Sequence, residues 1–252
     1  MLNRSVFFLV MMTGNVLFAY AQAVKSKENL QQLWFGYSTQ TRFSDKWGLW
    51  IDLHLRTKDD FVNNLSQSIV RTGLTYYVND ATKLTAGYAW VNLFPGDNHK
   101  YISQPEHRLW QQIQWHTNYR NKKMMQWIRL EEKFKHKILN DSALAQGYNF
   151  NYKLRYNFWY EFPLSKKGIV PGALSFIFND ELHINFGKQI VNNYFDQNRL
   201  FVGLKYQVNP HDNLQAGYMN LFQQLAAGNR YKNINAVRVF YFHNLDLRRK
   251  NN

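Results

Sequence analysis

Alternation of apolar and polar residues with a period of two dominates this chain from Leu33 onward. In the stretch 47–57, one face carries Leu49, Ile51, Leu53 and Leu55, and the other carries Trp50, Asp52, His54 and Arg56. Successive side chains of a β-strand point to opposite faces, so this pattern predicts a strand with one apolar and one polar face. Outside the N-terminal segment no stretch has the 3.6-residue period of a helix. Eleven strands are predicted, at residues 33–43, 47–57, 66–78, 83–94, 102–117, 124–135, 147–162, 173–186, 198–208, 213–222 and 235–247. The chain is therefore predicted to be all-β.

An internal repeat indicates how these strands are joined. Residues 73–79 (GLTYYVN) match residues 203–209 (GLKYQVN), and residues 84–88 (LTAGY) match residues 214–218 (LQAGY) at the same spacing. Both units then reach Asn-Leu-Phe, at 92–94 and 220–222. Each unit reads as a strand, a turn and a strand. A repeated hairpin favours an antiparallel up-and-down barrel.

The predicted connections also alternate in length. Those at 44–46, 79–82, 118–123 and 209–212 are short, and 164–172 is moderate. Between them lie the longer polar segments 58–65, 95–101, 136–146, 187–197 and 223–234. Short periplasmic turns on one rim with longer outer loops on the other are typical of bacterial outer-membrane barrels.

The N-terminus has the pattern of an export signal. Asn3-Arg4 precedes a largely apolar run over 6–18, and Ala19 and Ala21 are small residues at the positions that a signal peptidase reads. We expect residues 1–21 to be a cleaved signal peptide and residues 22–252 to form a single barrel domain. A membrane anchor is the alternative, but Thr13-Gly14-Asn15 interrupts a run that would need about 20 apolar residues. The chain has no Cys, which excludes a lipoprotein anchor, disulfides, thiolate metal sites and Cys nucleophiles.

Alternation alone does not separate a soluble barrel, apolar inside, from a membrane barrel, apolar outside. Charges of both signs lie on the polar faces, and they could pair across a narrow interior. These predicted interior charges are Arg71, Glu106, Arg108, Arg129, Glu131, Lys133, Lys153, Arg155, Glu181, Arg199 and Arg238. Aromatic residues gather near strand ends, as at Trp34, Trp47, Trp90 and Trp115, which suits an interfacial girdle. We therefore predict a transmembrane β-barrel of 10–12 strands in the outer membrane.

Strand number raises a question at the closure of the barrel. With both termini in the periplasm an even number is expected, and the strands from 47 to 247 already make ten. Segment 33–43 then either pairs at the closure or is joined by a twelfth crossing within 25–32.

The formal net charge is +14, from 31 Lys and Arg against 17 Asp and Glu. Basic residues recur on the predicted short-turn rim and at the C-terminus, where anionic phospholipid headgroups would attract them. They are Arg120, Lys122, Lys123, Lys166, Lys167, Arg248, Arg249 and Lys250. Outer-membrane lipids and small solutes or ions are the expected partners. Nucleic acid is not expected, since the chain is read as exported and carries no nucleic-acid-binding motif.

Few residues suggest chemistry. No phosphate loop, His-Glu-x-x-His, Gly-x-Ser-x-Gly or calcium-loop motif occurs, and no cofactor or metal site is predicted. Glu181 and His183 share a face and could act as a general acid–base pair, as in an outer-membrane hydrolase. His54 and His116 also face the predicted interior, but Ser175 is the only serine near Glu181, six residues away. A network of ion pairs filling the barrel is the favoured interpretation.

Several motifs carry a resemblance to a known family. They are Glu106-His107-Arg108-Leu109-Trp110, Arg129-Leu130-Glu131, Lys153-Leu154-Arg155-Tyr156, Asp180-Glu181 before Phe186-Gly187, Phe195-Asp196-Gln197-Asn198-Arg199 and Gly217-Tyr218-Met219. Over 32–247 the chain resembles domain-of-unknown-function family 2490 (DUF2490). That resemblance implies an exported outer-membrane barrel of Gram-negative bacteria and implies no catalytic residue. Lys133 and Lys153 stand where the family pattern suggests Arg.

The favoured functional hypothesis is a small or plugged pore, or a structural membrane protein, with anion preference if it conducts. One alternative is a hydrolase or lipid-modifying enzyme that uses Glu181 and His183. A second alternative is a soluble periplasmic barrel that binds a ligand.

Overall fold

The computed structural model describes residues 24–58, 60–96, 99–119 and 121–248. Within these ranges all regular secondary structure is β-strand, and no membrane-spanning helix is found. The strands are β1 (Ser26–Arg42), β2 (Trp47–Lys58), β3 (Asn64–Tyr77), β4 (Thr82–Leu93), β5 (Gln104–Tyr119), β6 (Lys122–Asn140), β7 (Ala143–Pro163), β8 (Leu174–Phe186), β9 (Phe195–Gln207), β10 (Asp212–Gln224) and β11 (Arg230–Asp246). The predicted signal segment, Arg120, Arg249 and Lys250 lie outside the described residues.

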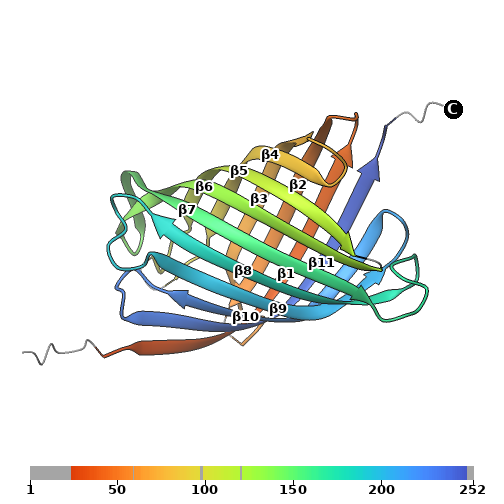
Figure 1. Ribbon diagram of the computed structural model, residues 1–252. Coiled ribbons are helices and arrows are strands. Elements are labelled where there is room, and N and C mark those ends of the chain that lie inside the picture. The colour runs from red at the N-terminus through yellow and green to blue at the C-terminus, as the bar shows by residue number, and fades with distance from the viewer. Residues whose placement is uncertain (1–23, 59, 97–98, 120, 249–252) are drawn as a thin grey trace, which may run out of the picture.

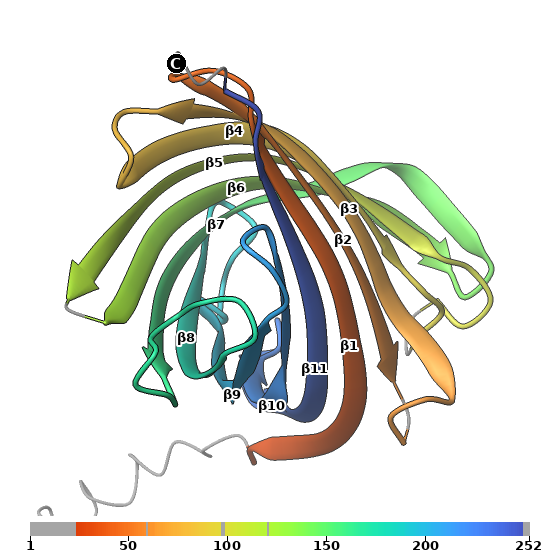
Figure 2. The same cartoon turned by 90° about the vertical axis from the view of Figure 1, so that its right-hand side faces the viewer.

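The eleven strands close into one barrel (Figure 1; Figure 2). Each strand from β1 to β11 pairs antiparallel with the next along the chain. The last pair, between β1 and β11, is parallel and runs from Ser26 opposite Arg230 to Arg42 opposite Asp246. The all-β prediction and the predicted barrel of 10–12 strands are both confirmed.

The expectation of an even strand number is wrong. Segment 33–43 pairs at the closure, and residues 26–32 are the beginning of the same strand, β1, rather than a further crossing. An odd number of up-and-down strands leaves the first and last strands parallel. Parallel pairing still satisfies the backbone N–H and C=O groups of both edges, so the barrel closes without an open edge.

Because the number is odd, β1 begins at one rim and β11 ends at the other, and Figure 1 shows the start of β1 and the end of β11 at opposite ends of the barrel. We name the rim that holds the β1–β2, β3–β4, β5–β6, β7–β8 and β9–β10 connections the turn rim. The other connections form the loop rim. Turn-rim connections have 4, 4, 2, 10 and 4 residues, and loop-rim connections have 5, 10, 2, 8 and 5.

The two rims therefore differ less than predicted. The loop expected at 136–146 is instead strand on both sides of a two-residue turn, Asp141-Ser142, because β6 and β7 pair beyond the predicted ends. These are the longest strands, with 19 and 21 residues. Strands β1 and β11 also begin earlier than predicted, at Ser26 and Arg230, since they pair with each other there.

The internal repeat forms two equivalent hairpins, β3–β4 and β9–β10. Their repeated glycines are cross-strand partners, Gly73 with Gly87 and Gly203 with Gly217. Each turn is closed in the same way. The Asn79 side chain accepts from the backbone N–H of residues 81 and 82 at 2.9 and 2.7 Å, and the Asn209 side chain accepts from residues 211 and 212 at 2.8 Å.

These glycines leave room for aromatic rings on the inner wall. A Cβ on Gly73 would meet the Trp110 ring at 2.7 Å, and one on Gly203 would meet the Phe201 ring at 2.6 Å. Trp110 and Phe201 are each about 1% exposed, so the rings fill the space that the glycines leave.

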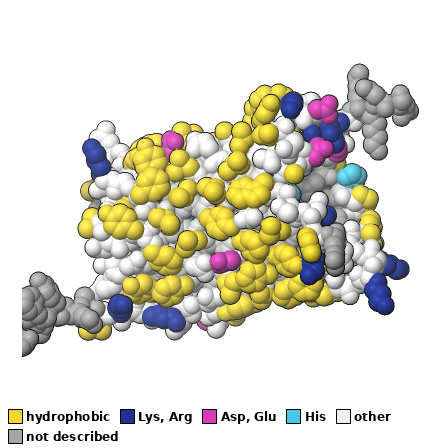
Figure 3. All heavy atoms as spheres, viewed as in Figure 1, with side chains coloured by type: hydrophobic (Ala, Val, Ile, Leu, Met, Phe, Trp, Pro, Cys, Tyr) yellow, Lys and Arg dark blue, Asp and Glu magenta, His cyan; other side chains and the backbone are white. Residues whose placement is uncertain are grey.

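The barrel is polar inside and apolar outside. Among the described residues the buried side chains are 30 polar or charged and 14 hydrophobic, while 43 large hydrophobic side chains are exposed. Figure 3 shows apolar side chains spread over the outer wall, with Lys and Arg toward its two ends. A water-soluble barrel places its apolar face inward, so the arrangement here is inverted with respect to that class.

The interior is divided between two kinds of wall. Apolar side chains of β1 and β8–β11 form one cluster next to the seam between β1 and β11. Its members are Trp34, Ile177, Phe201, Met219, Leu221, Ile234, Ala236 and Phe240. Most interior charges stand on β2–β9, and β8 and β9 carry both charged and apolar inward side chains.

Candidate functional site in the barrel interior

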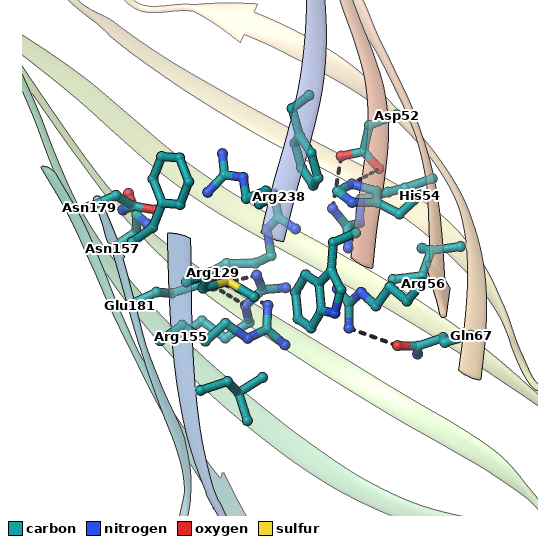
Figure 4. A pocket seen from close by; sticks show the side chains of 18 of the residues that line it. Asp52, His54, Arg56, Gln67, Arg129, Arg155, Asn157, Asn179, Glu181 and Arg238 are labelled. Atoms are coloured by element: carbon teal, nitrogen blue, oxygen red, sulfur yellow. Dashed lines mark hydrogen bonds and ion pairs between the residues drawn. The ribbon is translucent and has the colours of Figure 1, made fainter. Parts of the chain in front are cut away.

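A cavity of about 1630 Å³ lies in the interior. Its lining reaches Lys58 and Phe94 near the loop rim and His211 and Asp246 at the turn rim, so it extends along the barrel. Sixteen Lys and Arg residues line it against five Asp and Glu residues. Cations therefore outnumber carboxylates in the lining of the cavity, and Figure 4 shows part of the charged wall.

Glu131 is the centre of one ion-pair cluster at mid-height. Its carboxylate lies 2.5 Å from Arg155 Nη1, 3.1 Å from Arg108 Nη1 and 3.8 Å from Arg129 Nη1. Arg129 and Arg155 are direct cross-strand partners, a like-charge pair that would be destabilising by itself. One carboxylate between them, with 1% of its side chain exposed, offsets that repulsion.

Glu181 on β8 is the centre of a second cluster. It accepts from Arg155 Nε at 2.7 Å and lies 3.6 Å from Arg199 Nη1. His183 Nε2 lies 3.0 Å from the same carboxylate. Arg155 contacts both Glu131 and Glu181, so one guanidinium joins the two clusters across three strands.

Further ion pairs extend the network along the wall. Asp52 accepts from Arg71 at 2.8 Å, and Asp196 accepts from Lys153 at 2.5 Å. The other inward pairs are Glu106 with Arg108 and with Lys133, the latter at 3.3 Å, and Glu161 with Lys205 at 3.0 Å. Buried carboxylates thus each hold at least one cation.

Tryptophan rings orient the central arginine. Arg129 is 2% exposed, and its Cζ lies 4.4 Å from the Trp110 ring centroid, 5.0 Å from Trp127 and 5.5 Å from Trp50. Arg129 Nε also donates to Gln112 at 2.8 Å. A planar guanidinium that is stacked and hydrogen-bonded loses little further freedom when it forms ion pairs.

Every member of the predicted set of interior charges lies on the inward face. Ten of them take part in the ion pairs above, and Arg238 stands apart on β11. The predicted set left out Asp52 and Arg56, although the alternation placed both on the polar face of their strand, and it also left out Glu161 and Lys83. Glu161 continues the parity of Lys153 and Arg155 on the same strand, so its position was also open to prediction.

The Glu181–His183 contact lacks a nucleophile beside it. In the described part of the chain His183 contacts Glu181, Gln197 Nε2 at 3.0 Å and Asp196 at 4.0 Å, and no hydroxyl. Ser175 is buried on the same strand, six residues before Glu181, which corresponds to roughly 20 Å along a β-strand. His54 pairs with Asp52 at 3.4 Å and His116 contacts Gln114 Nε2 at 2.8 Å. Among described residues no group of three His, Asp and Glu is arranged to hold a metal ion.

The turn rim carries its own ion pairs. Arg42 Nη1 lies 2.7 Å from Asp80, and this hydrogen bond and charge lower the pKa of the Asp80 carboxyl below its ordinary value. Arg248 lies 2.6 Å from Asp246 and 3.4 Å from Asp45. The basic residues Lys122, Lys123, Lys166 and Lys167 are exposed on the same rim.

Comparison with known protein families gives one match. The family described as "Protein of unknown function (DUF2490)" matches residues 31–232. The chain belongs to DUF2490. The match covers most of the barrel, from β1 to the start of β11, and confirms the resemblance that the motifs indicated. No curated protein and no solved structure matches this chain.

Proposed function

We propose that this DUF2490 protein is an outer-membrane β-barrel whose interior is a narrow passage that prefers anions. The observation that carries the proposal is the cavity that reaches both rims, lined by sixteen Lys and Arg against five Asp and Glu. The inverted barrel supports the membrane location, because only lipid or a protein partner makes a continuous apolar outer wall favourable.

The strand number suits a narrow passage. Eight-stranded barrels are filled by side chains, while 16-stranded porins leave an open aqueous channel. Eleven strands lie between these sizes. The bridge from Glu131 through Arg155 to Glu181 further reduces the open cross-section at mid-height. Small ions fit such a passage better than large solutes.

Planar-bilayer recording tests the proposal. The detergent-folded protein is incorporated under a KCl gradient, and single-channel steps and the reversal potential are measured. We expect discrete steps and a reversal potential displaced toward the chloride equilibrium potential. Displacement toward the potassium value would contradict the anion preference. Absence of steps from protein whose barrel is shown to be folded by circular dichroism would contradict the passage and favour a structural role.

The contact of 3.0 Å between His183 Nε2 and Glu181 favours one second candidate, a lipid hydrolase in the barrel. The proposed passage predicts that folded protein in phospholipid vesicles releases no fatty acid beyond the rate of the His183→Asn variant. Release that His183→Asn abolishes would support the hydrolase. The soluble periplasmic barrel, in turn, requires recovery of folded protein without detergent, whereas the passage requires its recovery with the outer-membrane fraction.

A further inference from the structure

The seam of the barrel carries two arginines without an acidic partner. Trp34 on β1 has Arg238 of β11 as its cross-strand neighbour on one side and Arg56 of β2 on the other. Among the described residues neither arginine forms an ion pair. Arg56 donates to Gln67 Oε1 at 2.8 Å. Arg238 forms no hydrogen bond with any described residue. Both side chains line the cavity.

Aromatic rings hold both guanidinium groups in place. Arg56 Cζ lies 3.5 Å from the Trp34 ring centroid, and Arg238 Cζ lies 4.2 Å from Phe201 and 4.3 Å from Phe240. The rings themselves are buried, with 3% of Trp34, 1% of Phe201 and 8% of Phe240 exposed. The guanidinium groups and the rings beneath them therefore line the cavity together.

A third arginine completes the group. Arg199 Cζ lies 5.3 Å from the same Trp34 ring, and the charge of Arg199 acts on both Arg56 and Arg238. Glu181, which lies 3.6 Å from Arg199 Nη1, already contacts Arg155 and His183. Arg199 is attracted by Glu181 and, more weakly, by Asp196 and Glu131. Arg56 and Arg238 form no ion pair with any described residue, so the group keeps two positive charges that no carboxylate contacts.

We propose that Arg56, Arg199 and Arg238 form a binding site for a small, doubly charged oxyanion of the phosphate class. A guanidinium presents its N–H donors as a fork that matches the paired oxygens of phosphate, and a spherical chloride ion uses that fork poorly. Adjacent strands lie about 4.8 Å apart, so the Cα atoms of Arg238 and Arg56 are roughly 10 Å apart across β1. The guanidinium groups of Arg56 and Arg199 both lie over the Trp34 ring, close enough to contact one small anion together, and Arg238 lies over the neighbouring rings of Phe201 and Phe240.

This site adds detail to the proposed function. Its role, to bind anions on their way through the passage, rests on that proposed function. Binding itself does not require conduction. It is therefore tested on the full chain in detergent micelles by isothermal titration with inorganic phosphate, at an ionic strength held constant with NaCl.

We expect saturable binding of phosphate by the unchanged protein. Loss of a charge-assisted hydrogen bond predicts that Arg238→Gln and Arg56→Gln each weaken the affinity at least about tenfold. Lys83→Gln is the matched control, because it also removes one buried positive charge from the cavity lining but stands near the turn rim with Gln40 as its hydrogen-bond partner. It should change the affinity less than about threefold, since only general charge is lost.

Two results would overturn the site. One is the absence of saturable phosphate binding by folded protein. The other is an equal loss of affinity in Lys83→Gln and Arg238→Gln, which would assign the binding to net charge. Circular dichroism of each variant establishes that the barrel is folded. Chloride conduction in bilayers without phosphate binding would refute the site and leave the passage standing, while binding without conduction would do the reverse.

Discussion

Glu131 offers the sharpest test of the interior network, since three arginines depend on its carboxylate. We consider the substitution Glu131→Gln, which keeps the size of the side chain and removes its charge. Arg155, Arg108 and Arg129 then lose a partner that lies 2.5, 3.1 and 3.8 Å away. Each of the four side chains is at most 12% exposed. The direct cross-strand pair of Arg129 and Arg155 is left with less compensation.

The magnitude follows from the burial of these groups. Breaking a buried ion pair by removing one partner costs about 3–5 kcal/mol. Arg155 keeps its contact with Glu181 and Arg108 keeps its contact with Glu106, and water in the 1630 Å³ cavity hydrates part of the freed charge. These effects place the expected loss at the lower end, about 3 kcal/mol.

Urea unfolding of the protein in detergent micelles measures this loss through tryptophan fluorescence, because Trp110 and Trp127 stack on Arg129. For a slope of about 3 kcal/mol/M, the midpoint falls by roughly 1 M. Glu132→Gln is the matched control. Glu132 is the next residue on β6, has the opposite parity and pairs with outward-facing Leu109 and Tyr152. We expect no loss of stability from that change.

Equal midpoints for Glu131→Gln and the unchanged protein would refute the stabilising role of the network. A larger loss for Glu132→Gln than for Glu131→Gln would contradict the assignment of inward and outward faces.

Two further predictions concern the repeat. Asn79→Ala and Asn209→Ala each remove the two hydrogen bonds that the side chain accepts from the backbone of equivalent turns, and Asn209→Ala also removes the bond from Asn209 Nδ2 to Asp212 at 2.6 Å. Each change should lower the free energy of unfolding by about 1 kcal/mol. Losses of unfolding free energy that differ by more than twofold between the two variants would contradict the equivalence of the two turns. Gly73→Val places a branched side chain where the Trp110 ring lies 2.7 Å from the new Cβ, and this overpacking should lower the free energy of unfolding by about 1–3 kcal/mol. The double variant with Trp110→Leu should recover part of that loss, and additive losses would show that the ring is not the cause.

Strand positions were predictable because each strand has one apolar and one polar face. The period of two located all eleven strands, and Glu131 and Arg155, which it placed on polar faces, are buried and contact each other in the structure. The repeat predicted hairpins at β3–β4 and β9–β10, with their glycines and turn asparagines in the same register.

The seam could not be predicted from the pattern of single strands. Parallel pairing of β1 with β11 depends on where the barrel closes, and no local residue signals it. The extension of β6 past residue 135 and of β7 before residue 147 was missed for a similar reason. There His136 pairs with Tyr148, with their ring centroids 4.8 Å apart, and Ile138 pairs with Leu144, so the strands continue where the sequence becomes polar. Which cation meets which carboxylate also depended on register. Arg155, for example, joins Glu131 and Glu181, which lie 50 positions apart in the sequence.

The most direct test of the central claim, a barrel with its apolar face in lipid and its charged face in water, is spin labelling along β6 in phospholipid vesicles. The chain has no Cys, so a single introduced cysteine carries the only nitroxide. Ile128→Cys reports on the outward face, where Ile128 is 41% exposed, and Met125→Cys reports on the cavity. We predict that the label at 128 collides preferentially with oxygen dissolved in the bilayer and that the label at 125 collides preferentially with a water-soluble nickel chelate. Preferential collision with the nickel chelate at both positions, in folded protein, would contradict the claim.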